Sequence, residues 1–219
     1  MKINADLSKR VVLNTHELPW VDSPLPGVQR RMLERDGAEV ARATSLVRYA
    51  PNSYFHEHTH GGGEEFLVLD GVFSDEMGDF PAGMYVRNPV GSKHSPHTKD
   101  GCLILVKLRQ FEPADQDYVR LDTRQAEWLP GPFDGLSVLP LHQYGSEQVE
   151  LLKMAAGTRF DQSLYPLGVE LYVLSGAFSD AHGSYPAGTW LRNPAGLESS
   201  SCSESGCVMY LKTGHLPAR

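Results

Sequence analysis

A long internal repeat is the feature of this sequence that most constrains its fold. The stretch EEFLVLDGVFSDEMGDFPAGMYVRNPVGS at 64–92 returns as VELYVLSGAFSDAHGSYPAGTWLRNPAGL at 169–197, which is 105 residues further on. A repeat of this length indicates two copies of one structural unit. We therefore expect two tandem domains, residues 1–113 and 114–219, joined near the polar segment EPADQDYVRL at 112–121.

Each copy has the pattern of a series of short strands. The runs FLVL, MYVR and CLILVKL in the first copy, and LYVL, TWLR and CVMYLK in the second, are separated by turn sequences such as DG, MGDFPAG and NPVG. Helical periodicity is nearly absent. The pattern predicts an all-β fold class, with each unit of about a hundred residues forming a β-sandwich or a small jelly-roll barrel.

Composition excludes several kinds of protein. The net charge of −7 and the absence of a basic run argue against direct nucleic-acid binding. No stretch of eighteen apolar residues occurs and the first residues lack an apolar segment, so we expect neither membrane insertion nor export, and a cytoplasmic location. The cysteines Cys102, Cys202 and Cys207 are odd in number and lack CxxC spacing, which predicts buried thiols rather than disulfides or a zinc finger.

The stretch HEHTHGGGEE at 56–65 is the strongest chemical signal. Its histidines, His56, His58 and His60, stand on alternate positions. Side chains at i, i+2 and i+4 of a strand share one face, so three imidazoles would converge if this stretch is extended. A polar surface strand is the alternative interpretation.

Two spaced motifs extend this signal and resemble those of a known superfamily. One stretch resembles the first cupin motif and reads His58-x-His60-x3-Glu64-x6-Gly71. Another resembles the second motif and reads Gly83-x5-Pro89-x-Gly91-x2-His94, although Thr98 stands where that motif has an asparagine. More narrowly, EEFLVLDGVFSD with YVRNPVGSKHSPH is similar to the ChrR cupin-like family, whose founding members are zinc-dependent anti-sigma factors.

The resemblance implies two tandem cupin barrels, also called double-stranded β-helix or jelly-roll barrels. It further implies a metal inside the first barrel, held by His58, His60, Glu64 and His94. Imidazoles with a carboxylate suit borderline divalent ions. We expect one such ion per chain, with Zn²⁺ favoured and Fe²⁺, Mn²⁺ or Ni²⁺ as alternatives.

The second copy of the repeat lacks this ligand set. The four candidate ligands fall opposite Ser163, Tyr165, Val169 and Ser199. The sequence therefore predicts one intact site and a degenerate C-terminal barrel. By contrast, Glu65 and Arg87 are retained as Glu170 and Arg192, so we expect structural roles for them, either as an ion pair or as other satisfied polar groups.

Other side chains around the site have more than one possible role. His56 could be exposed, orient a ligand, or act as a catalytic acid or base, and His97 could be a surface residue or hydrogen-bond locally. An apolar cavity, or simply a packed core, would be formed by the inward residues Tyr54, Phe66, Val68, Phe73, Tyr85 and Val106.

Two functional hypotheses follow. The family resemblance implies a metal-dependent sensor or regulatory module of the ChrR type, with a sigma factor or another regulatory protein as partner. ChrR-type proteins carry a helical anti-sigma domain with its own zinc site, and we expect that domain to be absent here because no cysteine precedes Cys102. The alternative is an Fe(II)-dependent cupin dioxygenase acting on a small diketone or hydroxyaryl ketone bound in the N-terminal barrel. In either case open sheet edges predict a homodimer.

Overall fold

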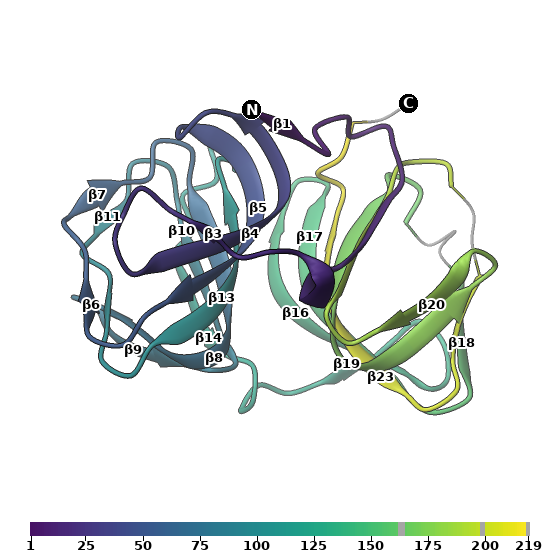
Figure 1. Ribbon diagram of the computed structural model, residues 1–219. Helices are drawn as coiled ribbons and strands as arrows, with labels where there is room; N and C mark the ends of the chain where they lie inside the picture. The colour runs from purple at the N-terminus through teal and green to yellow at the C-terminus, as the bar shows by residue number, and fades with distance from the viewer. Residues whose placement is uncertain (162–164, 198–199, 218–219) are drawn as a thin grey trace. The chain divides into compact units, whose positions relative to one another are not determined.

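The protein consists of two compact β units, which the computed structural model describes for residues 1–161, 165–197 and 200–217 (Figure 1). Unit 1 contains Met1–Ala5 and Leu18–Ala126, and unit 2 contains Asp6–Glu17 and Glu127–Arg219. No α-helix occurs among the described residues, and none of their elements could span a membrane as an apolar helix. The expected all-β class and the paired barrels are confirmed.

The elements of unit 1 are all strands: β1 (Lys2–Ile3), β3 (Val21–Asp22), β4 (Val28–Gly37), β5 (Ala41–Tyr49), β6 (Ser53–Tyr54), β7 (His58–Thr59), β8 (Glu64–Asp75), β9 (Gly78–Pro81), β10 (Met84–Asn88), β11 (Lys93–His94), β12 (His97–Thr98), β13 (Cys102–Leu108) and β14 (Val119–Asp122). The main sheet has the order β1-β4-β5-β13-β8-β10-β14, and every pairing in it is antiparallel. Strand β8 also pairs with β9 and β12, so that one long strand serves both faces of the barrel.

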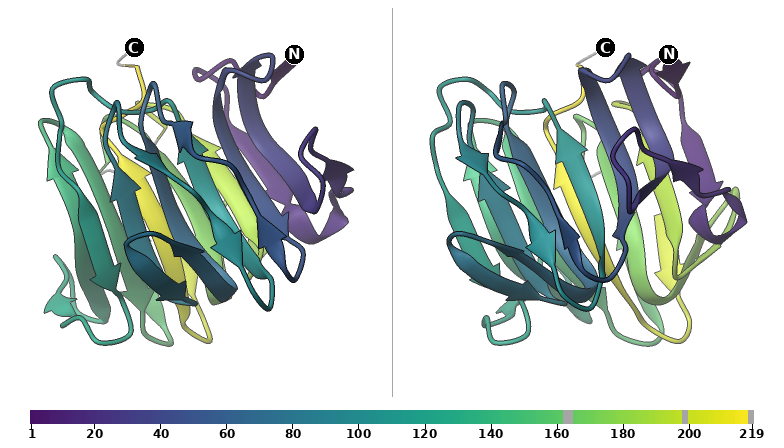
Figure 2. Two further views of the ribbon diagram at one scale, coloured as in Figure 1. Left: turned by 90° about the vertical axis from the view of Figure 1, so that its left-hand side faces the viewer. Right: turned by 60° about the vertical axis from the view of Figure 1, so that its left-hand side comes forward.

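Unit 2 repeats this arrangement with β2 (Val11–Asn14), the 3-10 helix η1 (Thr15–Glu17), β15 (Leu129–Pro130), β16 (Leu136–Tyr144), β17 (Glu147–Met154), β18 (Thr158–Asp161), β19 (Val169–Asp180), β20 (Gly183–Pro186), β21 (Thr189–Asn193), β22 (Ser200–Ser203) and β23 (Cys207–Thr213). Its main sheet has the order β15-β16-β17-β23-β19-β21-β2. Both views in Figure 2 show the strands of each unit as closely spaced, curved arrows.

The last strand of each main sheet comes from the segment that precedes the other copy of the repeat. Strand β2, near the N-terminus of the chain, pairs with β21 in unit 2, and β14 pairs with β10 in unit 1. In Figure 1 the purple segment with η1 accordingly lies with the green and yellow strands. The predicted domain boundaries, 1–113 and 114–219, remain a prediction.

A bulge in β8 determines which of its side chains enter the barrel. Phe66 and Val68 belong to the apolar core of unit 1, and so does Phe73, which has the opposite parity. The register with β13 shifts between Leu103 and Ile104, which leaves one residue of β8 without a partner. Because side chains alternate along a strand, this extra residue lets both ends of β8 present side chains to the same interior.

This core contains some, but not all, of the residues that were expected to point inward. Phe66, Val68, Phe73 and Val106 are core residues. Tyr54 is 74% exposed and stacks on His97 at a ring-centroid distance of 5.7 Å, so its expected inward position is wrong. Tyr85 is buried, but its hydroxyl donates to Glu65 at 2.7 Å.

Candidate metal centre

Three histidines converge at one end of the first barrel. His58 in β7 and His94 in β11 are direct cross-strand partners in a two-stranded ribbon, and His60 follows β7. Candidate donor atoms of all three lie within 4.8 Å of one another, and Nε2 of His60 is 3.0 Å from Nε2 of His94. Two nitrogens bound to one ion at about 2.1 Å each lie about 3.0–3.4 Å apart, so the spacing suits a shared divalent ion.

Glu64, the first residue of β8, completes this group on one side. Its Oε2 lies 3.3 Å from Nε2 of His60 and 3.6 Å from Nε2 of His94. The same oxygen accepts a hydrogen bond from Nδ2 of Asn88 at 3.1 Å. The predicted ligands are thus brought together, with His60, Glu64 and His94 buried and His58 exposed. Metal binding by these four side chains stays a prediction, supported by the chemistry of the donor set.

Hydrogen bonds at the other ring nitrogen hold two of the histidines in position. Nδ1 of His94 lies 3.1 Å from Oδ2 of Asp75, and Nδ1 of His58 lies 3.2 Å from the carbonyl oxygen of His56. A histidine that donates from Nδ1 presents Nε2 with its lone pair, which is the form that binds a metal ion. His56 therefore contributes through its backbone, while its ring is exposed, and a role as acid or base stays a prediction.

The pKa values of His60 and His94 are shifted in opposite directions. Burial lowers the pKa of His60, and the negative charge of Glu64 offsets this only partly. Burial also acts to lower the pKa of His94, but the hydrogen bond to Asp75 and the charge of Glu64 outweigh it, so the pKa is raised. An ion binding here would therefore displace a proton more readily from His60 than from His94.

Asp75 is the residue of this site that sequence reasoning missed. It stands at the end of β8, is buried, and also accepts a hydrogen bond from the backbone N–H of Met77 at 2.8 Å. The bulge in β8 is what turns it toward His94. The second copy retains this residue as Asp180, which accepts hydrogen bonds from the Tyr185 hydroxyl and the backbone N–H of His182. Because the aspartate is present in both copies, its pattern in the sequence is that of a structural turn residue.

Glu65 lies on the opposite side of β8 from the histidines. Its carboxylate accepts from Arg87 at 2.8 Å, and Arg87 also donates to Asp115 at 2.5 Å. The ion pair considered from the sequence is present and fully buried. Alternation along β8 explains why two adjacent glutamates have different surroundings.

The second barrel has no equivalent cluster among its described residues. Opposite His60 and Glu64, Tyr165 donates to Glu150 at 2.8 Å and Val169 is buried in the apolar core. Ser163 and Ser199, opposite His58 and His94, lie outside the described residues. Cys102 and Cys207 are buried strand residues as expected, whereas Cys202 in β22 is only half-buried, and burial raises the pKa of Cys102 to about 12.

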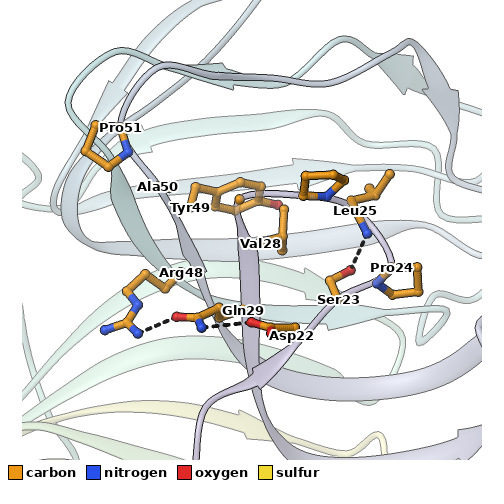
Figure 3. Close-up of a pocket in the computed structure, with 12 residues that line it drawn as sticks. Asp22, Ser23, Pro24, Leu25, Val28, Gln29, Arg48, Tyr49, Ala50 and Pro51 are labelled. Atoms are coloured by element: carbon orange, nitrogen blue, oxygen red, sulfur yellow. Dashed lines mark hydrogen bonds between the residues drawn. The ribbon is translucent and has the colours of Figure 1, made fainter.

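A pocket of about 300 Å³ opens beside the histidines. Its wall includes His58, His60 and Glu64, and apolar side chains of unit 1 such as Val47 and Val106. A larger hollow of about 680 Å³ contains none of the candidate ligands. Figure 3 shows it, with Arg48, Gln29 and Asp22 joined by hydrogen bonds along one side. The smaller pocket is the better candidate for a reaction site, because it gives a bound molecule access to the ligand cluster.

Comparison with known proteins identifies the kind of fold. The family model of the ChrR cupin-like domain matches residues 8–112 and again 116–217. No curated protein matches the sequence.

Solved structures match only at low identity. A candidate dioxygenase from Nostoc punctiforme is 16% identical, with a TM-score of 0.77 over 94% of this chain and 82% of that one. The protein Ylba from Escherichia coli is 15% identical, with a TM-score of 0.74 over 98% and 95%. The bacterial pirin YhhW from Escherichia coli, solved with nickel(II), is 13% identical, with a TM-score of 0.68 over 96% and 100%. These likenesses concern the fold.

Proposed function

This chain belongs to the ChrR cupin-like family, and from that premise we propose that its first barrel is a metal-dependent oxygenase site for a small oxygen-rich molecule. The observation that carries the proposal is the position of His58, His60 and Glu64 in the wall of a pocket of about 300 Å³. An ion held there would face the pocket, so a substrate in it could reach the ion.

The metal for this function would be Fe²⁺, which would supply the capacity to activate dioxygen. The residues of the chain would hold and orient the reactants. His58, His60, Glu64 and His94 would bind the ion, Asp75 and the carbonyl oxygen of His56 would keep the rings in place, and the apolar wall would exclude water. A small diketone or hydroxyaryl ketone is the substrate class. Dioxygen is the oxidant, a carbon–carbon bond of the substrate breaks, and both oxygen atoms enter the products.

The test combines metal content with oxygen consumption. The purified protein should contain about one divalent ion per chain, and His94→Ala should contain much less. The protein reconstituted with Fe²⁺ should consume oxygen when a β-diketone such as pentane-2,4-dione is added, and His94→Ala should not. Absence of oxygen uptake with every diketone and hydroxyaryl ketone, in a protein that holds iron, would contradict the oxygenase.

A regulatory module of the ChrR type is the second candidate, and the family match over both copies of the repeat favours it. Zinc bound by all four ligands would fill a tetrahedral shell, as in structural sites. The partner would be a sigma factor or another regulatory protein, and the active form a homodimer. Purification of the native protein with zinc rather than iron, together with zinc-dependent binding to a sigma factor, would favour this candidate over the enzyme.

A further inference from the structure

Arg109 has a backbone conformation that its side chain disfavours. Its φ is 57°, and the other non-glycine residues with positive φ in the described part of the chain are Asn4 and Asn52. Asparagine tolerates this region, whereas a longer side chain is rare there. Such residues concentrate at functional sites, because elsewhere glycine replaces them at lower cost.

The second barrel has that glycine. Gly214 stands 105 residues after Arg109 and has nearly the same conformation, with φ of 69°. Both residues follow the strands β13 and β23, which carry the matched Lys107 and Lys212. The same turn therefore uses glycine in the barrel without the ligand set and arginine in the barrel with it.

The glycines that follow His60 make room for the Arg109 side chain. A Cβ atom on Gly62 would lie 2.7–2.8 Å from Cα, Cβ and Cγ of Arg109, and one on Gly61 would lie 3.3 Å from its Nη2. The second copy has Pro166 and Leu167 at these positions, opposite Gly214. The side chain of Arg109 thus lies against the segment that joins His60 to Glu64. Arg109 is an exposed residue and is among those that line the pocket. Its guanidinium has no hydrogen bond or ion pair to any of the described residues.

A second arginine enters the same pocket. Arg30 in β4 pairs across the sheet with the core residue Val47 and lines the pocket. Its Nη1 lies 3.4 Å from the exposed Glu39, but its buried Nε has no hydrogen-bond partner in the described structure. The equivalent residue of the second barrel, by the pairing of β16 with β17, is Val138, which packs against the apolar core.

We propose that Arg109, with Arg30, forms an anion-binding subsite beside the metal centre, and that the substrate is a small carboxylic acid with a neighbouring keto or enol oxygen. The inference rests on the proposed function and specifies its substrate class. Arginine presents planar N–H donors that match a carboxylate, and the volume of about 300 Å³ suits a molecule of this size. The carboxylate would lie at the arginines and the keto oxygens would point toward Glu64 and the histidines.

Two probes that differ in one group test the subsite. Pentane-2,4-dione is neutral, and 2,4-dioxopentanoate has a carboxylate in place of one methyl group. Binding is measured by isothermal titration calorimetry on the zinc-loaded protein, so the readout does not depend on turnover. We expect 2,4-dioxopentanoate to bind about tenfold or more tightly than pentane-2,4-dione.

Variants taken from the second barrel remove the subsite with little strain. Arg109→Gly introduces the residue that the matched turn has, and Arg30→Val introduces the residue at the matched strand position. Both should lose most of the preference for the acid while binding pentane-2,4-dione within about twofold of the parent protein. Arg124→Ala removes an exposed arginine paired with Asp122 outside the pocket, and it should retain the preference.

The outcomes separate this inference from the proposed function. A metal-loaded parent that binds both probes alike, or an Arg109→Gly variant that keeps the preference, would overturn the anion subsite. A parent without metal would contradict the proposed function. Even then, preference for the acid in the metal-free protein and its loss in Arg109→Gly would support the subsite.

Discussion

Individual side chains of the first barrel have roles that depend on which nitrogen or oxygen they present. Asp75 illustrates this best, because it holds Nδ1 of His94 while its other oxygen closes a turn. Its counterpart Asp180 closes the equivalent turn, but bonds Tyr185 instead of a histidine. The pair therefore offers a matched comparison of the same residue with and without a candidate metal ligand beside it.

Asp75→Asn should weaken metal binding by about tenfold, because the neutral amide no longer stabilises His94 in the orientation and tautomer that bind an ion. A competition titration with a chelator measures the affinity. Asp180→Asn is the control and should leave the affinity unchanged. Equal effects of the two substitutions would mean that Asp75 acts only on the turn.

Glu64→Gln and Glu65→Gln should separate metal binding from stability. Glu64→Gln should abolish metal binding, as its carboxylate lies beside His60 and His94. Glu65→Gln should retain the metal but lower the free energy of unfolding by about 3 kcal/mol, because it leaves the buried Arg87 with less compensation. Elemental analysis and urea unfolding of the metal-free proteins measure the two effects. Loss of metal from Glu65→Gln without unfolding would reverse the assignment.

At the scale of elements, the segment before each repeat completes the barrel of the other repeat. Thr15, just after β2, donates through Oγ1 to the carbonyl oxygen of Gly188 at 2.7 Å. Thr123, just after β14, donates in the same way to Gly83 at 2.6 Å. Each bond fixes the end of an edge strand, and the similarity of THELPW at 15–20 to TRQAEW at 123–128 reflects this shared role.

Thr15→Ala should lower the free energy of unfolding by about 1–3 kcal/mol, since it removes a buried hydrogen bond and leaves a carbonyl oxygen with one partner fewer. The loss should appear as faster amide hydrogen exchange in β2 and β21 of unit 2. Thr123→Ala should instead accelerate exchange in β10 and β14. A change in β10 caused by Thr15→Ala would contradict the pairing of β2 with β21.

For the whole molecule, the two barrels share a fold but differ in the candidate ligand set, which among the described residues only the first barrel contains. One divalent ion per chain should therefore stabilise unit 1 selectively. Chelation should accelerate amide hydrogen exchange in β7, β11 and the start of β8, and leave β19, β21 and β23 unchanged. His94→Ala should show no response to the chelator. Two ions per chain, or a response in β19, would mean that the second barrel also binds metal.

The all-β class, the paired barrels and the candidate ligands His58, His60, Glu64 and His94 could all be predicted before the structure was known. The all-β class and the two units follow from local alternation, turn residues and the offset of the repeat. The barrels and the ligand set were implied by the resemblance to the two cupin motifs. The choice of Glu64 over Glu65 also came from the repeat, because Glu65 is retained as Glu170 and Glu64 is not.

The positions of Asp75, Arg109 and Arg30 became apparent only in the folded chain, and so did the pairing of β2 with β21 and of β14 with β10. A bulge in β8 turns Asp75 to the interior. The left-handed backbone conformation of Arg109, just after β13, brings its side chain over the glycines after His60. Both depend on register and on pairings between residues far apart in the chain. Alternation within one strand cannot specify them, because a shift of one residue reverses every side chain.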